Sequence, residues 1–260
     1  MWLPTLKMEE LETKVIKAYS ENKIRNLYKE SVKEGLWKSE ELLIDKYFKK
    51  DSKILDIGCG TGRTTFQLAK KGYNIIGIDI VPVMIESAKE LNKEFNARIE
   101  FKVMNATYLE FENETFDGAI FSFCGWDQIP KKENRLKALK EIYRVLKYYG
   151  HFILTSYSRG GLWPGNWFKI YLLKPLGFNV KEVEYGDIFF KKGGKEIYEG
   201  EQFIHFPTLS KVKKQIEEVG FKLVFSDRRN SIAYEDKKLD SGDCTFFVCK
   251  KNLEKQSSTF

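Results

Sequence analysis

Short apolar runs alternate with amphipathic stretches through the middle of the chain, between residues 51 and 156. The apolar runs contain no regular polar positions, which is typical of strands buried on both faces of a parallel sheet. The stretches between them place apolar residues at helical spacing. This alternation predicts strands over residues 53–57, 74–80, 98–104, 116–123 and 152–156, with helices over residues 64–71, 82–95 and 133–147.

The two ends of the chain depart from this alternation. Residues 1–50 have helical periodicity with a break at Gly35, and another helix is expected after Thr208. Two strands then follow, over residues 221–226 and 245–250, with no helix between them, so they are expected to pair antiparallel. The expected fold class is α/β: a doubly wound, mostly parallel sheet of seven strands with the last strand antiparallel.

Residues 157–207 fit no strand–helix–strand unit. A long irregular segment inside a compact domain is usually functional, so we expect a cap insertion over the substrate. The cap is aromatic and basic, and three roles are open to it: a packed lid, a lining for an apolar or aromatic small molecule, or contact with a membrane surface. The lid is favoured because the helical run is short. The expected parts are an N-terminal helical segment (1–50), a core (51–156), the cap (157–207) and a C-terminal helix and antiparallel hairpin completing the sheet (208–260).

Composition narrows the class of protein. The 260 residues include 44 Lys and Arg against 37 Asp and Glu, a formal net charge of +7, and 15% aromatic residues, which exclude a disordered chain. The lysines form scattered doublets with acidic neighbours, so a solvated surface is favoured over nucleic-acid binding. No apolar stretch is long enough to span a membrane. The four cysteines form no CxxC pair and have no histidine at metal-ligand spacing, so no metal site and a cytoplasmic setting are expected.

Glycine-rich and polar loops follow the first four predicted strands. Residues 56–63 (Asp-Ile-Gly-Cys-Gly-Thr-Gly-Arg) form a glycine-rich turn, and Asp79 ends the second strand. Asn105 and Ala106 follow the third strand, and residues 122–127 follow the fourth. Open parallel sheets bind ligands at the carboxyl ends of their strands, where an acidic residue can accept hydrogen bonds from ribose hydroxyls. Together these loops indicate a nucleoside-type ligand, without separating NAD from other adenosyl cofactors.

Several motifs are shared with a known family. Residues 54–62 (Ile-Leu-Asp-Ile-Gly-Cys-Gly-Thr-Gly) resemble the first motif of the class I S-adenosylmethionine-dependent methyltransferases. The segment 77–85, with Asp79 and Met84, is similar to the acidic loop of that family, and residues 116–120 with 139–147 are similar to its fourth- and fifth-strand region. The resemblance implies a Rossmann-like methyltransferase fold, S-adenosyl-L-methionine as cofactor and S-adenosyl-L-homocysteine as its product.

The resemblance also implies a role for each matching position. The glycine loop would pack against the amino-acid end of the cofactor, with Asp56 near its ammonium group, and Asp79 would bind the two ribose hydroxyls. Many relatives carry Asp in place of Asn105, whose amide oxygen is still expected to accept from the adenine amino group. By analogy, the N-terminal helices are expected to close over the cofactor with Tyr28 or Trp37 inward. The expected cofactor contacts are Asp56, Gly58, Cys59, Gly60, Thr61, Gly62, Asp79, Ile80, Met84, Asn105, Ala106 and Phe123.

Methyl transfer is a displacement at a carbon that the sulfonium charge already activates, so the enzyme mainly aligns the reactants and excludes water. A general base is needed only when the acceptor must lose a proton. The candidates for catalysis are His205, Asp127 and Tyr157, with Arg159 near the same mouth; a packed structural histidine is the alternative for His205. The expected function is methyl transfer to an apolar or aromatic small molecule. The alternatives are an RNA (tRNA) methyltransferase and a non-catalytic S-adenosylmethionine-binding protein.

Overall fold

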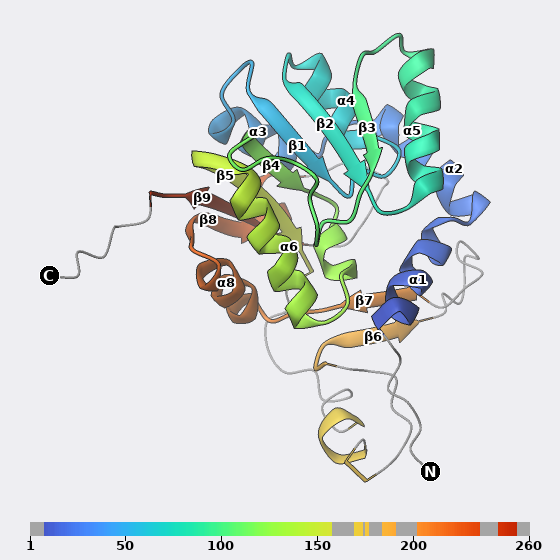
Figure 1. The fold of residues 1–260 in the computed structure, drawn as a ribbon, viewed down its shortest axis with the longest axis vertical. Coiled ribbons are helices and arrows are strands. Elements are labelled where there is room, and N and C mark those ends of the chain that lie inside the picture. The colour runs from blue at the N-terminus through green and yellow to red at the C-terminus, as the bar shows by residue number, and fades with distance from the viewer. Residues whose placement is uncertain are drawn as a thin grey trace, which may run out of the picture.

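A seven-stranded sheet forms the centre of the protein (Figure 1). The computed structural model describes residues 8–157, 169–173, 175–176, 184–190, 202–234 and 244–253. The strand order is β3-β2-β1-β4-β5-β9-β8, and every pairing is parallel except those of β9, which runs antiparallel to β5 and β8. This confirms the predicted fold class with its reversed last strand. The strands are β1 (Lys53–Ile57), β2 (Asn74–Asp79), β3 (Glu100–Val103), β4 (Phe116–Phe121), β5 (Leu146–Ser156), β8 (Phe221–Arg228) and β9 (Thr245–Lys251).

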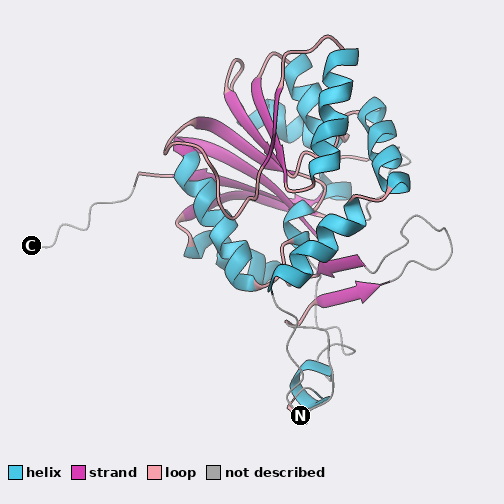
Figure 2. Ribbon diagram, turned by 45° about the vertical axis from the view of Figure 1, so that its right-hand side comes forward, coloured by secondary structure: helices cyan, strands magenta, loops and turns pink. Residues whose placement is uncertain are grey.

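Helices cover both faces of the sheet (Figure 2). Apart from a π-helix in the cap, the helices of the described residues are α1 (Met8–Tyr19), α2 (Asn22–Glu34), α3 (Lys38–Tyr47), α4 (Arg63–Lys70), α5 (Pro82–Glu94), η1 (Gly125–Gln128), α6 (Lys132–Val145), α8 (Leu209–Glu218) and α9 (Arg229–Ile232). Ile54 belongs to a core cluster with residues of α3 and α4, whereas the next residue, Leu55, belongs to a cluster with residues of α6 and α8. Because successive side chains of a strand point to opposite faces, a sheet covered on both sides needs unbroken apolar runs. None of the described helices has the length and apolar character needed to span a membrane.

Two predictions about the C-terminal half of the sheet are corrected. Strand β5 begins at Leu146, whose partner is Phe116 on β4, so α6 ends at Val145 and the strand starts six residues earlier than predicted. The short helix α9 lies between β8 and β9, where none was predicted. The backbone N–H of Arg229 in α9 donates to the carbonyl of Cys244 at 2.8 Å. A single turn contains too few residues to show a helical period in the sequence.

The described parts of the cap include a small sheet of their own. Strands β6 (Asp187–Phe190) and β7 (Gln202–His205) pair antiparallel, and β7 lies against α1 and η1. Figure 1 shows this hairpin beside α1, at the end of the molecule to which the parallel strands point. Residues 169–173 form a short π-helix. Arg159 and most of the aromatic and basic run of the expected cap lie outside the described residues.

Candidate cofactor and substrate site

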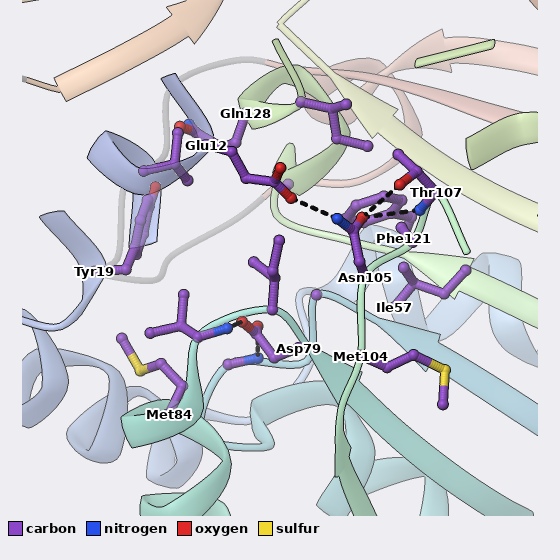
Figure 3. Close-up of a pocket in the computed structure, with 18 of the residues that line it drawn as sticks. Glu12, Tyr19, Ile57, Asp79, Met84, Met104, Asn105, Thr107, Phe121 and Gln128 are labelled. Carbon is purple, nitrogen blue, oxygen red and sulfur yellow. Dashed lines mark hydrogen bonds between the residues drawn. The ribbon is translucent and has the colours of Figure 1, made fainter. Parts of the chain in front are cut away.

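A pocket opens at the carboxyl ends of β1, β2, β3 and β4, between them and the N-terminal helices (Figure 3). The loops after all four strands contribute to its wall, which is where an open parallel sheet binds its ligands. Helices α1 and α2 supply the opposite wall, and η1 and the first turn of α6 supply one end. Of the expected cofactor contacts, the residues that line this pocket are Gly58, Gly60, Asp79, Ile80, Met84, Asn105, Ala106 and Phe123.

The glycine loop after β1 approaches the pocket with its backbone. Gly58 and Gly60 have φ of +64° and +56°, in the left-handed region that favours glycine. A Cβ atom on Gly60 would lie 3.1 Å from the ring of Tyr28, and one on Gly58 would lie 2.8 Å from the ring of Phe121. A side chain at either position would therefore fill the space beside the loop or displace an aromatic ring that lines the pocket.

Asp79 ends β2 with its carboxylate at the pocket wall. Its Oδ2 accepts from the backbone N–H of Gly60 at 2.8 Å, and its Oδ1 accepts from the N–H of Val81 at 2.9 Å. Burial raises the pKa of Asp79, and these two backbone hydrogen bonds oppose the shift. A carboxylate has about four lone-pair sites, so these two hydrogen bonds leave capacity for a further donor. The arrangement suits a pair of neighbouring hydroxyl groups that both donate to one carboxylate.

Asn105 lies at the pocket wall in an orientation that differs from the expectation. Its Oδ1 accepts from both the backbone N–H and the hydroxyl of Thr107, each at 3.0 Å, and its Nδ2 donates to Oε1 of Glu12 on α1 (Figure 3). A backbone N–H can only donate, so it identifies the amide oxygen. Both lone pairs of that oxygen are engaged. The amide oxygen is therefore not free to accept from an adenine amino group, as the sequence led us to expect.

Four expected cofactor contacts lie behind the pocket lining instead of in it. Asp56 is buried and accepts from the Thr65 hydroxyl at 2.6 Å. Burial raises the pKa of Asp56 to about 7, although that hydrogen bond and the charge of Arg63 oppose the shift. The Thr61 hydroxyl donates to the backbone carbonyl of Tyr28 at 2.7 Å, which ties the glycine loop to α2. The residues of this group are Asp56, Cys59, Thr61 and Gly62.

The N-terminal helices supply lining residues that the motifs do not reveal. Glu12, Val15 and Tyr19 of α1 face the pocket, and none of them carries a motif in the sequence. Tyr28 lines the pocket as expected by analogy. Trp37 lies outside the lining, where its ring stacks on Phe123 with 5.1 Å between centroids. The analogy with the family placed the N-terminal helices over the cofactor, but the helical periodicity of residues 1–50 does not show which residues of α1 face it.

Asp127 and Tyr157, two of the catalytic candidates, lie together outside the pocket lining. Asp127 has no exposed surface; it accepts from the Ser156 hydroxyl at 2.8 Å and from the backbone N–H of Tyr157 at 2.6 Å. The Tyr157 ring packs against Phe206, with 5.6 Å between centroids. Burial raises the pKa of Asp127 to about 7, against the effect of these hydrogen bonds. Both oxygens of Asp127 hold the end of β5 against η1, so the geometry gives this carboxyl a structural task.

The raised pKa of Asp127 predicts a pH-dependent contribution to stability. Folding raises the pKa of Asp127 from 3.8 to about 7, so the folded state favours the protonated carboxyl. Protonation of Asp127 therefore stabilises the fold fully below the unfolded-state pKa of 3.8, and this contribution is lost as the pH rises through 7. The loss amounts to about 4 kcal/mol. Asn at position 127 can donate to Ser156 and accept from Tyr157 without titrating. We therefore expect the wild type to lose about 4 kcal/mol relative to Asp127→Asn between roughly pH 4 and pH 8. Urea unfolding across that range measures this, and parallel profiles would contradict it.

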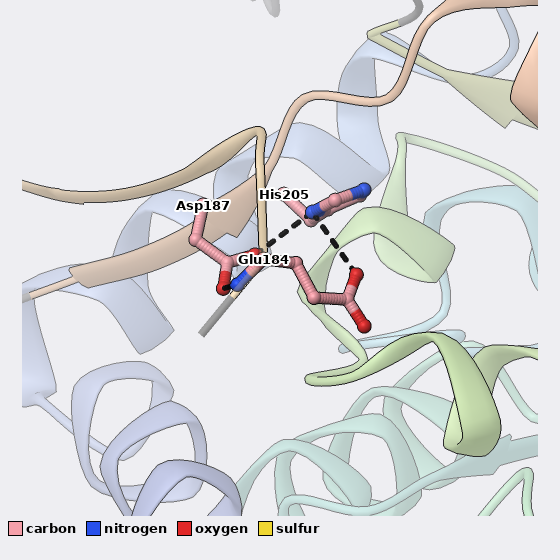
Figure 4. Close-up of side chains that lie close together, drawn as sticks. All are labelled: Glu184, Asp187 and His205. Atoms are coloured by element: carbon pink, nitrogen blue, oxygen red, sulfur yellow. Dashed lines mark hydrogen bonds and ion pairs between the residues drawn. The ribbon is translucent and has the colours of Figure 1, made fainter. Parts of the chain in front are cut away.

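His205, the third catalytic candidate, lies in a buried cluster at the junction of cap and core (Figure 4). Its Nδ1 donates to Oδ1 of Asp187 at 2.8 Å and lies 3.8 Å from Oε2 of Glu184. Burial lowers the pKa of His205, and the hydrogen bond to Asp187 opposes this. His205 does not line the pocket. The packed-histidine alternative describes its surroundings better than the role of a base facing the acceptor.

The same three side chains have the composition of a metal site, since their ligand atoms lie within 4.8 Å of one another. The two carboxylates of the cluster already have partners within the protein, however. Glu184 pairs with the guanidinium of Arg135 on α6 and accepts from the backbone N–H of Lys132, while Asp187 accepts from the backbone N–H of Glu184 at 2.7 Å. A cation at this place would compete with the charge of a buried arginine. The cluster therefore acts as an ion-paired junction between the cap and α6.

The sequence of this chain is similar to those of known methyltransferases. The family described as "Methyltransferase domain" matches residues 54–150. The chain is 34% identical over 201 residues to the ubiquinone/menaquinone biosynthesis C-methyltransferase UbiE of Rickettsia prowazekii, a match covering 73% of this chain and 75% of that protein. It is 29% identical to phosphoethanolamine N-methyltransferase 3 of Arabidopsis thaliana over 71% of this chain. The chain spans only 38% of that plant protein's length.

Two solved structures have the same fold. A SAM-dependent methyltransferase from Methanosarcina mazei matches with a TM-score of 0.66 and 24% identity, covering 85% of this chain and 100% of the other. The 1,6-didemethyltoxoflavin-N1-methyltransferase of Burkholderia thailandensis, solved with bound 1,6-didemethyltoxoflavin and S-adenosylhomocysteine, matches with a TM-score of 0.63 and 15% identity over 97% of this chain and 93% of the other. The chain belongs to the class I S-adenosylmethionine-dependent methyltransferase family.

Proposed function

We propose that this chain transfers a methyl group from S-adenosylmethionine to a small, mainly apolar acceptor molecule. The observation that carries the proposal is the pocket enclosed between the strand ends and helices α1 and α2. A site walled on both sides by the protein suits a small molecule better than the broad surface of a folded RNA. The net charge of +7 leaves RNA as the alternative acceptor, which the experiment below addresses.

The residues present fit the cofactor. The order β3-β2-β1-β4 places Asp79 of β2 between the β3 loop and the β4 loop. If Asp79 binds the ribose hydroxyls, the base lies on one side and the methionine part on the other. The wall toward β3 contains Ile80, Met84 and Met104, which offer apolar surface to a flat base. The methionine part would then lie along the glycine loop toward Phe123.

The cofactor, when bound, supplies a methyl group made electrophilic by the sulfonium charge. The chain therefore needs to hold the acceptor in line with that group and to keep water out. Tyr28 and Phe123 meet edge to face with 6.0 Å between their centroids, and Tyr19 meets Tyr28 in the same manner at 5.9 Å. These rings form an apolar wall between solvent and the glycine loop. We assign them the exclusion of water and not a proton transfer.

The acceptor is proposed to enter from the η1 end of the pocket. Phe121, Ile129 and Pro130 line this end, with Gln128 as a polar neighbour. Such a lining, mostly apolar with a few polar groups, is typical of small-molecule sites. The relatives act on different acceptors by name: one is a C-methyltransferase of quinone biosynthesis and another methylates phosphoethanolamine. Their variety supports the reaction and leaves the acceptor to be identified.

A label-transfer experiment tests the proposal. The full-length chain is incubated with S-adenosylmethionine carrying a radioactive methyl group, together with a metabolite extract or with bulk tRNA. We expect label in the small-molecule fraction that partitions into organic solvent, and none with Asp79→Ala. Label in tRNA would support the RNA alternative instead. Cofactor binding without transfer to either fraction would indicate a non-catalytic binding protein.

A further inference from the structure

Recognition of adenine requires an acceptor at the β3 side of the pocket. The exocyclic amino group of adenine is a donor, and a donor buried without an acceptor is costly. Asn105, at the end of β3, turns its amide nitrogen toward the pocket because Thr107 engages its oxygen twice. The side chain of Asn105 therefore does not supply this acceptor.

Glu12 of α1 has the required chemistry and position. Among the described residues that line the pocket, the carboxylates are Asp79 and Glu12. Asp79 lies at the end of β2, whereas Glu12 reaches across the pocket to the β3 loop, where its Oε1 accepts from Nδ2 of Asn105 (Figure 3). In the part of the chain that the structure describes, no hydrogen bond engages the second oxygen, Oε2. That oxygen is an acceptor on the wall beside the β3 loop.

We propose that Glu12 accepts a hydrogen bond from the exocyclic amino group of adenine, and that α1 closes over the base through this contact. The inference rests on the proposed function and adds to it the residue that selects the base. Asn105 is a positioning residue in this scheme, since its amide nitrogen holds one oxygen of Glu12 and orients the other. A base with a carbonyl in place of the amino group would set two oxygen acceptors against each other and would be rejected.

The test compares two ligands in the wild type and three variants by calorimetric titration. The ligands are S-adenosylhomocysteine and its deaminated analogue, S-inosylhomocysteine, which has a carbonyl oxygen where adenine has the amino group. The variants are Glu12→Gln, Glu12→Ala and the control Glu30→Gln; Glu30 is an exposed α2 residue paired with Lys33 at 3.0 Å. Gln at position 12 can still accept from Asn105 with its amide oxygen while its amide nitrogen donates to a carbonyl. The deaminated base also carries a hydrogen on its ring nitrogen N1, where adenine has none. This difference affects every protein equally, so it cancels when the ratio of the two affinities in one protein is compared with that ratio in another.

We expect the wild type and Glu30→Gln to prefer S-adenosylhomocysteine by roughly 10- to 100-fold, the range of a hydrogen bond to a charged group. In Glu12→Gln this preference should fall to near unity or reverse, and in Glu12→Ala it should fall without reversing. An unchanged ligand ratio in both Glu12 variants, with binding retained, would overturn the role of Glu12 and leave the cofactor assignment intact. A wild type that binds neither ligand would overturn the cofactor site and this inference with it.

Discussion

Replacement of Glu40 by alanine is expected to lower the free energy of unfolding by about 3–5 kcal/mol. Glu40 is fully buried, and its two carboxylate oxygens accept from the guanidinium of Arg63 at 2.6 and 2.7 Å. Burial opposes ionisation of Glu40, but the charge and hydrogen bonds of Arg63 outweigh it and hold the pKa below its usual value. Removal of the carboxylate leaves a buried guanidinium without its counter-charge, which is the costly way to break such a pair.

The pair also connects parts of the molecule that form the pocket. Arg63 begins α4 directly after the glycine loop, and its guanidinium lies over the rings of Trp37 and Phe123 at 5.1 and 5.2 Å from their centroids. Glu40 accepts from the hydroxyl of Ser122, which lines the pocket. The variant is therefore expected to weaken cofactor binding as well as stability.

The neighbouring residue Glu41 provides a matched control. It pairs with Lys38 at 3.0 Å and with Lys71 at 3.2 Å on the surface. Exposed pairs contribute about 0–1 kcal/mol, so Glu41→Ala is expected to change the unfolding free energy within that range. Urea unfolding at neutral pH measures both variants. Equal losses for Glu40→Ala and Glu41→Ala would contradict the assignment of the buried pair.

Replacement of Asp79 by alanine is expected to weaken binding of S-adenosylhomocysteine by roughly 100-fold or more. Two hydroxyl groups donating to one carboxylate form charge-assisted hydrogen bonds, each worth about 1.5–3 kcal/mol. The variant also removes the acceptor of the backbone N–H groups of Gly60 and Val81, which donate to the Asp79 carboxylate at 2.8 and 2.9 Å. The glycine loop then loses one of the contacts that hold it in its binding conformation.

Calorimetric titration of the ligand into protein stripped of cofactor measures this effect. Glu86→Ala serves as the control, since Glu86 is an exposed carboxylate on α5, the helix that follows Asp79. Wild-type affinity in Glu86→Ala together with lost affinity in Asp79→Ala would locate the ribose contact. Comparable affinity in all three proteins would remove Asp79 from the binding site.

Contiguous features of the sequence account for most of the fold and for the centre of the pocket. Strand β1 has the predicted bounds, and β2 ends one residue before its predicted end. A buried strand needs an apolar run, and that run is visible without knowledge of its neighbours. The glycine loop and Asp79 can be found in the same way, because the few residues around each of them are enough to indicate its role.

The tertiary structure alone decided how distant side chains share their hydrogen bonds. Glu12 and Asn105 are 93 positions apart, and no local pattern shows that the amide nitrogen of Asn105 would meet a carboxylate of α1. Asp56 and Thr61 match the family motif, yet their hydrogen bonds to Thr65 and to Tyr28 place them behind the lining. His205 had the chemistry of a base, but Asp187 and Glu184 enclose it at the junction with the cap. Residue type and local spacing determine which element forms and what a side chain can do. Which partner satisfies that side chain depends on packing between elements, which no local pattern encodes.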